Sequence, residues 1–178
     1  MVLYKDSRRI DFETKVNWNE SQRFLKVAFD TSVRSTKATY DIQYGFVERP
    51  THYNTSWDYA KFEVVGHKWA DISEGNYGVS LLNNCKYGYN TKDKSIELSL
   101  LKSAKSPDFE ADMGEHNFIY SLLPHSGNLT ENNIIEEATA LNLPVKYFDG
   151  EIENAKRILK IGSDNICVDA VKKAEDDN

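Results

Sequence analysis

The sequence predicts an all-β protein, an antiparallel β-sandwich with one short helix, and three observations point to it. From Ile10 to Trp18, apolar and polar residues alternate at a period of two, which is the pattern of a half-buried strand. Later short apolar runs are separated by Gly, Pro, Asn and Asp, residues that favour turns. Strands and helices do not alternate regularly, so a parallel sheet of the Rossmann kind is not indicated. We therefore expect two packed sheets of antiparallel strands.

Further strands are expected wherever the alternation or a short apolar run recurs. These segments are Leu25–Phe29, Tyr40–Phe46, Val79–Leu82, Ile96–Leu101, Phe118–Leu123, Ile158–Ile161 and Ile166–Val171. From Ile134 to Leu141 the apolar residues instead recur at helical spacing, ahead of Pro144, which predicts a short crossover helix. The acidic end, 172–178, is expected to be frayed.

Length and charge limit the class of protein. A chain of 178 residues can form one domain that buries roughly two thirds of its unfolded surface, so we expect a single sandwich unit over 1–178. A net charge of -6 argues against a nucleic acid or an anionic membrane as partner. No apolar run approaches the roughly 20 residues that cross a bilayer. Cys85 and Cys167 are far apart and suggest neither a disulfide framework nor a zinc ribbon, which favours a reducing, cytoplasmic location.

The stretch from Glu48 to Tyr89 is unusually rich in Trp, Tyr, Asn, Asp and Gly. Aromatic side chains interleaved with amides and carboxylates suggest contact with a polyhydroxylated ligand or with an adjoining domain. The alternative is that the aromatic residues are core residues with satisfied polar tips. The residues to which this alternative applies are Trp57, Trp69, Tyr77 and Tyr87.

The acidic residues and histidines are the side chains of this sequence that could carry catalysis or bind a metal. Asp71 and Glu74 are the best candidates for the carboxylate pair that glycoside hydrolysis uses, because they lie among aromatic and amide residues. Acidic residues next to Gly more often form turns and caps, so catalysis is not the favoured interpretation. The histidines have no metal-ligand spacing, and metal binding is not favoured either. They are His52, His67, His116 and His125.

Several motifs resemble, in the same order, the C-terminal region of glycoside hydrolase family 38 α-mannosidases. The segments are RIDFETKVNW, FLKVAFDTSVRSTKATYDIQYGFV, ERPTH-NTSWD-A-FEV, H-WADISEGNYGVSLLNNCKYGY, LSLLKS and D-GEHNFIYSLLPH. Together they span most of the chain, so the resemblance is specific.

The resemblance implies a fold for this chain and places catalysis in a different domain of the parent protein. The fold would be part of a galactose mutarotase-like supersandwich, which packs on an N-terminal catalytic domain of the same parent chain. Family 38 enzymes are retaining α-mannosidases whose aspartate nucleophile and zinc ligands lie in that N-terminal domain. The parent would hydrolyse terminal α-linked mannose from oligosaccharides. No catalytic residue, metal ligand or zinc ion is therefore expected in this chain.

The resemblance further implies that some residues contact the substrate rim or the catalytic domain. These are Arg49, His52, Asn54, Trp57, Asp58, Asp71, Glu74, Tyr77, Asn83, Lys86 and Tyr87. Arg49 could form a two-pronged bond to a carboxylate of the catalytic domain, which would leave it without a partner here. Two other hypotheses remain open: a stand-alone carbohydrate-binding sandwich, and a structural module that stabilises the catalytic domain or a homo-oligomer.

Overall fold

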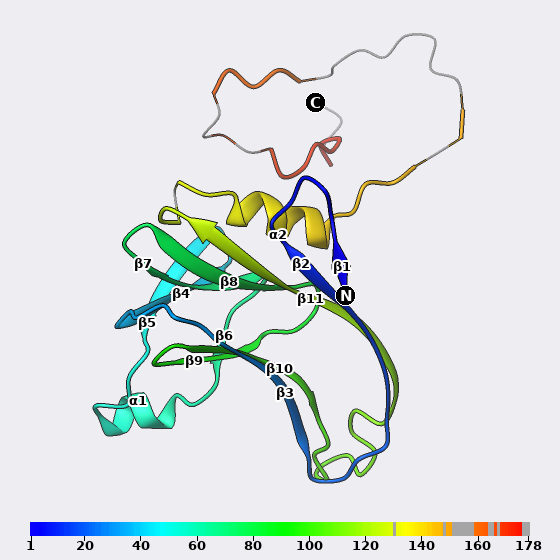
Figure 1. Ribbon diagram of the computed structural model, residues 1–178. Coiled ribbons are helices and arrows are strands. Elements are labelled where there is room, and N and C mark those ends of the chain that lie inside the picture. The colour runs from blue at the N-terminus through cyan, green and yellow to red at the C-terminus, as the bar shows by residue number, and fades with distance from the viewer. Residues whose placement is uncertain (130, 148, 151–158, 164–165, 167, 176–178) are drawn as a thin grey trace. The chain divides into compact units, whose positions relative to one another are not determined.

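The protein is described by a computed structural model over residues 1–129, 131–147, 149–150, 159–163, 166 and 168–175 (Figure 1). Its internal contacts divide it into two compact units, Met1–Val145 and Lys146–Asn178. The single sandwich unit expected over 1–178 stays a prediction, and the strands and helices of the described residues belong to the first unit. The described residues of the second unit form neither helix nor strand.

The two strands expected near the C-terminal end are wrong where the structure describes them. Residues 159–161, 166 and 168–171 lie outside any strand, while Ile158 and Cys167 fall outside the described residues. Ile161 and Ile166 are 43% and 59% exposed. A short apolar run becomes a strand only if a neighbouring strand satisfies its backbone, and the run itself does not specify that neighbour. The expected fraying of 172–178 stays a prediction.

The larger sheet has seven strands in the order β1-β2-β11-β8-β7-β4-β5, and all neighbours are antiparallel. In chain order, its strands are β1 Val2–Leu3, β2 Ile10–Trp18, β4 Lys37–Ile42, β5 Gly45–Pro50, β7 Trp69–Glu74, β8 Tyr77–Asn83 and β11 Gly114–Ser126.

The smaller sheet has four antiparallel strands in the order β3-β10-β9-β6. They are β3 Phe24–Asp30, β6 Val64–Val65, β9 Gly88–Lys92 and β10 Ser95–Lys102. The main core lies between the two sheets, because its buried side chains come from both. Those from the larger sheet are Ala38, Tyr40, Ala70, Leu81 and Phe118, and those from the smaller sheet are Tyr89, Ile96, Leu98 and Leu100. The predicted antiparallel sandwich is confirmed.

Helix α2, Ile134–Asn142, confirms the helix expected at this position, although no strand follows it in the described residues and it is not a crossover. Ile134 and Ala138 pack on a second cluster formed by Trp69, Leu82 and Leu123. Trp69 lies one residue before Ala70, and successive strand residues point to opposite faces, so α2 covers the outer face of the larger sheet.

One buried arginine ties α2 to the sheet. The Arg9 guanidinium contacts Asp11 Oδ1 at 2.7 Å and Glu137 Oε2 at 2.9 Å. Arg9 and Asp11 are both buried, so the pair is shielded from water.

The strand expected over Tyr40–Phe46 is wrong, because two strands and a turn occupy it. Strands β4 and β5 form a hairpin in which Ile42 pairs with Gly45 and Tyr40 with Val47. Tyr44 is in the turn with a φ of 58°, and its side chain is fully exposed. The alternation of apolar and polar residues continues through the turn, so the sequence pattern did not reveal that a turn is there. The strands expected from Ile10, Leu25, Val79, Ile96 and Phe118 onwards are confirmed as β2, β3, β8, β10 and β11.

No helix of the described residues is both long and apolar enough to span a membrane.

Candidate functional site

The candidate residues gather most densely on the connection from β5 to β6, residues 51–63, called here the α1 connection. It contains the short helix α1, Ser56–Ala60. Strand β5 is the edge of the larger sheet and β6 the edge of the smaller one, so the connection crosses from one sheet to the other at the side of the sandwich. Figure 1 shows α1 projecting beyond the strands at this side.

A capping box starts α1. The Thr55 hydroxyl accepts a hydrogen bond from Asp58 N at 3.1 Å, and Asp58 Oδ2 accepts one from Thr55 N at 3.2 Å. The Thr55 hydroxyl also lies 2.8 Å from Asp58 Oδ2, and this hydrogen bond is the main cause that lowers the pKa of Asp58 below its ordinary value. Asp58 therefore acts as a helix cap, which is a structural use of that candidate carboxylate.

The side chains of α1 do not hold it to the sandwich, since none of its residues is buried. Trp57 is 77% exposed, Tyr59 72% and Phe62 65%. Tyr53 packs edge-on against Tyr59, with ring centroids 5.9 Å apart. Large apolar side chains clustered on a projecting segment are typical of a surface that another protein segment or a ligand covers.

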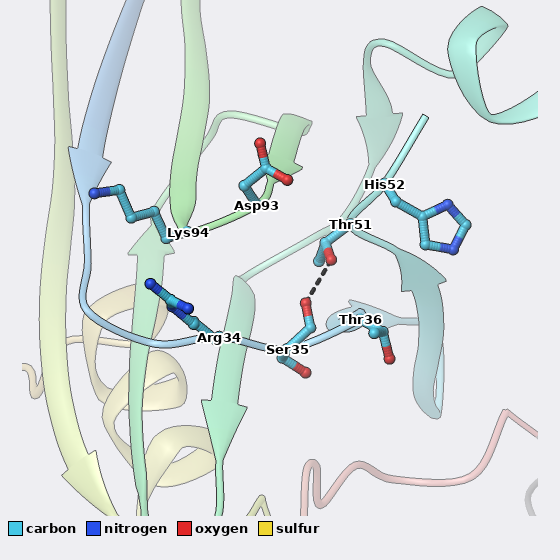
Figure 2. Close-up of a pocket in the computed structure, with 7 residues that line it drawn as sticks. All are labelled: Arg34, Ser35, Thr36, Thr51, His52, Asp93 and Lys94. Carbon is cyan, nitrogen blue, oxygen red and sulfur yellow. Dashed lines mark hydrogen bonds between the residues drawn. The ribbon is translucent and has the colours of Figure 1, made fainter. Parts of the chain in front are cut away.

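A cavity of about 520 Å³ lies next to the start of the α1 connection (Figure 2). Its lining comes from three connections and consists of Arg34, Ser35, Thr36, Thr51, His52, Asp93 and Lys94. Thr51 joins these connections: its N–H donates to Thr36 O at 3.1 Å, its carbonyl accepts from Asp93 N at 3.0 Å, and its hydroxyl donates to Ser35 O. The rigid backbone at Thr51 thus fixes where His52 and the α1 connection begin.

A second cavity, of about 290 Å³, lies between β5, β9 and the end of the α1 connection. Its lining is Tyr40, Val47, Glu48, Arg49, Pro50, Asp58, Lys61, Val64, Asn90, Thr91 and Lys92. We call it the Arg49 cavity. Three cations and two carboxylates contribute to it, and one of the carboxylates, Glu48, forms a salt bridge with Lys37 at 2.7 Å.

Arg49 has no polar partner among the described residues. Its Nη1 is buried and makes no hydrogen bond, and the guanidinium carbon lies 4.7 Å from the centre of the Tyr40 ring. Burial lowers the pKa of Arg49, because a half-buried cation loses solvation that its neighbours do not replace. A buried guanidinium nitrogen without a partner is unusual in a folded protein and marks this cavity.

Asp71 lies inside the first unit, not on its surface. Its carboxylate accepts hydrogen bonds from the hydroxyls of Ser73 and Ser80, and its Oδ1 lies 2.8 Å from His125 Nε2. The other His125 nitrogen accepts from the Asn132 amide at 3.2 Å, so Nε2 holds the proton and donates to Asp71. Asp71 thus has a structural role within the first unit, next to the segment that precedes α2, and its expected contact with the substrate rim or the catalytic domain stays a prediction.

Asn83 is also buried and organises the chain within the first unit. Its amide nitrogen donates to His67 O at 2.9 Å, and its carbonyl oxygen accepts from Cys85 N at 2.9 Å and from Lys86 N. It also donates to the hydroxyl of Tyr89, whose pKa burial raises far above its ordinary value. Asn83 shapes the β8–β9 connection, and its expected contact with the substrate rim or the catalytic domain stays a prediction.

The four remaining candidates lie on two other connections. Glu74 and Tyr77 flank the β7–β8 turn, where Glu74 accepts a hydrogen bond from Arg34 N beside the first cavity. Lys86 and Tyr87 lie between β8 and β9, with Lys86 Nζ 4.5 Å from the centre of the Phe118 ring and Tyr87 57% exposed. Their role as contact residues is still a prediction.

The arrangement does not support acid–base chemistry in the described residues. Asp71 is enclosed by its own hydrogen bonds while Glu74 is exposed, so the two do not form the open carboxylate pair that glycoside hydrolysis needs. No group of three or more His, Cys, Asp or Glu side chains within the described ranges could hold a metal ion.

The comparison with protein families decides which family this sandwich belongs to. The model of the family described as "Glycosyl hydrolases family 38 C-terminal domain" matches residues 1–110. The chain belongs to this family. The family 38 resemblance found in the motifs is thus confirmed, and all eleven candidate residues lie within the matched residues.

Relatives of this family 38 chain are α-mannosidases. It is 50% identical over 182 residues to alpha-mannosidase G of Dictyostelium discoideum, covering 99% of this chain and 17% of the relative. It is 43% identical over 169 residues to alpha-mannosidase 2C1 of Homo sapiens, covering 93% and 16%, and 45% identical over 174 residues to the alpha-mannosidase of Saccharomyces cerevisiae, covering 96% and 16%. The chain therefore spans only about a sixth of these relatives' length.

Two solved structures share the fold. An alpha-mannosidase from Enterococcus faecalis V583 superposes with a TM-score of 0.70 at 21% identity, covering 83% of this chain and 18% of that one. A protein of glycosyl hydrolase family 38 from Enterococcus faecalis gives a TM-score of 0.68 at 21% identity, covering 80% and 17%. At this identity the likeness concerns the fold alone.

Sequence reasoning missed part of the site. Tyr53, Tyr59 and Phe62 add to the exposed surface, and Lys61 and Lys92 add cations to the Arg49 cavity. The aromatic residues lie within five residues of Trp57 in the sequence, close enough to have been included with it. Lys92 comes from a distant strand and gave no comparable signal.

Proposed function

We propose that this chain is the C-terminal β-sandwich of a longer α-mannosidase, which hydrolyses terminal α-linked mannose from oligosaccharides with retention of configuration. The observation that supports this most is the combination of the family match with relatives that are all α-mannosidases. Each of these relatives is about six times as long as the aligned segment, which leaves room for a separate catalytic domain.

In this proposal the sandwich supports catalysis without performing it. The candidate carboxylates of the described residues are engaged structurally, Asp58 in a helix cap and Asp71 in a buried network. The residues described do not fit a zinc site, since no cluster of suitable ligands forms among them. As the family 38 resemblance implies, zinc and the nucleophile would belong to the N-terminal domain of the parent chain.

The α1 connection is the surface we assign to the partner domain or to the rim of the sugar cleft. Arg49, His52, Asn54, Trp57 and Asp58 all lie on it or immediately before it. Exposed Trp and Tyr side chains combined with an unpaired Arg are the residue types that dominate protein interfaces energetically. Tyr77, Glu74, Lys86 and Tyr87 would contribute from the neighbouring connections.

We also propose a reducing, cytoplasmic location for the protein. Cys85 is exposed and forms no disulfide among the described residues, and exposed free thiols persist in compartments where disulfides are rare. Location of a fluorescent fusion of the longer protein tests this proposal, and a secreted or vesicular signal would contradict it.

The test of function compares this chain with the longer protein that includes the preceding coding sequence. Both are assayed on a chromogenic α-mannoside with and without a chelator. We expect turnover by the longer protein only, and we expect the chelator to abolish it. Turnover by residues 1–178 alone, or an inert longer protein, would contradict the proposal.

A second candidate function is carbohydrate binding by the sandwich itself, which the exposed rings of Trp57 and Tyr59 favour. Calorimetric titration of residues 1–178 with methyl α-mannoside distinguishes the two. Specific binding that Trp57→Ala abolishes would support a binding module, whereas no binding agrees with an interdomain surface.

A further inference from the structure

Within the described residues the Arg49 cavity has an excess of positive charge. Arg49, Lys61 and Lys92 line it, against Glu48 and Asp58. Both carboxylates are already engaged, Glu48 with Lys37 at 2.7 Å and Asp58 in the cap of α1. Lys92 Nζ donates to the His52 carbonyl at 3.2 Å and lies 3.3 Å from the centre of the Tyr53 ring. Neither Arg49 nor Lys61 forms a salt bridge in the part of the chain that is described.

The guanidinium of Arg49 is positioned in this cavity with a hydrogen-bond donor that no described residue uses. Its guanidinium carbon lies over the Tyr40 ring, 4.7 Å from the ring centre, and Tyr40 is itself almost fully buried in the core. This cation–π contact holds the guanidinium beside the ring without using its N–H groups, and Nη1 is buried without a hydrogen bond among the described residues. A planar, oriented and unsatisfied guanidinium matches a carboxylate, which can accept two parallel hydrogen bonds from it.

We propose that the Arg49 cavity receives a carboxylate side chain from the remainder of the parent chain, and that this ion pair anchors the sandwich to its neighbouring domain. The inference rests on the proposed function only in assuming that a longer chain exists. The cavity volume of about 290 Å³ admits a side chain and is small for a separate organic ligand.

The surroundings of the cavity favour a protein carboxylate over a free anion. The α1 connection borders the cavity and exposes Trp57, Tyr59 and Phe62. A central Arg surrounded by large aromatic side chains is the usual composition of an interface hot spot, where the apolar rim excludes water from the ion pair. A free phosphate would gain nothing from these rings.

The first experiment identifies the partner group directly. In the longer protein, Arg49→Lys places an amine in the cavity, and a carbodiimide then joins amines to carboxylates in contact without a spacer. Mass spectrometry of the peptides should show residue 49 linked to an Asp or Glu outside residues 1–178. Arg34→Lys, an exposed arginine that lines the neighbouring cavity, is the control and should not give this link. Links from residue 49 only to carboxylates within 1–178, or no link, would overturn the proposal.

A second experiment uses the sign of a stability change. Arg49→Met removes an uncompensated half-buried charge from residues 1–178 alone, so their urea midpoint should be unchanged or higher. In the longer protein the same substitution leaves a buried carboxylate unpaired, and the midpoint of the sandwich should fall. Arg34→Met should leave both midpoints unchanged. A fall of equal size in both proteins would show that Arg49 acts only within the sandwich and would overturn the proposal.

The free-anion alternative is tested in the longer protein by adding inorganic phosphate at constant ionic strength. With the cavity filled by a side chain, phosphate should not raise the thermal midpoint through Arg49. A rise that Arg49→Met abolishes would assign the cavity to a free anion. It would overturn the proposal that a carboxylate side chain of the parent chain fills the cavity. None of these three measurements depends on turnover, so they remain informative even if the longer protein is inert.

Discussion

Asp71 accepts hydrogen bonds from three side chains that are buried or half-buried themselves, Ser73, Ser80 and His125. The network lies on the face of the larger sheet that α2 covers. Because a buried donor that loses its acceptor costs more than an exposed one, each member supports the position of the others. At the scale of single residues, the buried polar side chains around Asp71 stabilise the fold through hydrogen bonds to one another.

We expect Asp71→Asn to destabilise residues 1–178 by about 1–3 kcal/mol, because one oxygen acceptor becomes a donor facing other donors. The free energy of unfolding in urea measures this. Glu13→Gln, an exposed change on β2, is the control and should stay within about 0.5 kcal/mol. Equal values for the two variants would mean that the Asp71 network adds no stability.

Gly78 is required by the same network. A Cβ at this position would lie 2.4 Å from His125 Cε1 and 2.4 Å from Ser73 Oγ. We expect Gly78→Ala to cost about 1–3 kcal/mol of unfolding free energy through overpacking. Gly45→Ala is the matched control, since a Cβ there meets no atom within 4 Å. Thermal or urea unfolding of both variants checks the difference, and a neutral Gly78→Ala would show that His125 moves freely.

At the scale of elements, α1 is a five-residue helix that depends on its cap, because its side chains are not buried. The sequence did not indicate it, since five residues are too few to show helical periodicity. The nine residues of α2 do show that periodicity, and this helix was predicted. The difference lies in what stabilises each helix: an apolar face is visible in a sequence, whereas a capping box such as Thr55–Asp58 is only one of many similar pairs.

The cap gives α1 a defined dependence on pH. The folded-state pKa of Asp58 is lowered, chiefly by the hydrogen bond from the Thr55 hydroxyl. Its stabilising effect is therefore complete above the unfolded carboxyl value, roughly 3.9, and is lost as pH falls through the lower folded value. We expect a carbon-13 titration of the Asp58 carboxyl to show the lowered pKa and the helical shifts of α1 to disappear with it.

Substitution of Thr55 tests the cause of that pKa shift. Thr55→Ala should return the pKa of Asp58 toward its ordinary value and disorder α1 at neutral pH, whereas Thr55→Ser retains the hydroxyl and should preserve both. An unchanged Asp58 titration in Thr55→Ala would assign the shift to another group.

The strands show how far periodicity can be trusted. Alternation identified β2 and β3 because one face of each strand is core and the other is not. Strand β7 was missed because its apolar and polar residues alternate only from Ala70 to Ser73, and Trp69 and Glu74 break the alternation at either end. The turn at Tyr44 was missed for the opposite reason, because exposed aromatic residues continued the alternation.

At the scale of the whole molecule, the exposed aromatic residues of the α1 connection and Arg49, which has no polar partner among the described residues, lie on one side of the sandwich. For a chain that spans about a sixth of its relatives, this side is the one that best fits an interdomain contact. The remaining candidates on the β7–β8 turn and the β8–β9 connection extend the surface that such a contact could use.

We expect Trp57→Ala to leave the urea midpoint of residues 1–178 unchanged, because the side chain is 77% exposed. In the longer protein the same change should lower the thermal midpoint and speed limited proteolysis between the domains. Tyr44→Ala, a fully exposed tyrosine in another turn, should affect neither protein.

Sedimentation of residues 1–178 completes this test. If the chain associates with itself and Trp57→Ala prevents this, the surface contacts a second copy, and the homo-oligomer hypothesis replaces the interdomain one.

The sequence by itself determined the sandwich class, most of the long strands, α2 and the family, because alternation, apolar spacing and motif order are properties of neighbouring residues. Only the tertiary structure decided which polar residues are inside and which are outside. Asp71 and Trp57 have similar neighbours in the sequence, yet one is enclosed under α2 and the other is exposed on α1. Burial depends on which distant strand packs nearby, and so does the Arg49 cavity, where Lys92 and Tyr40 meet from separate sheets.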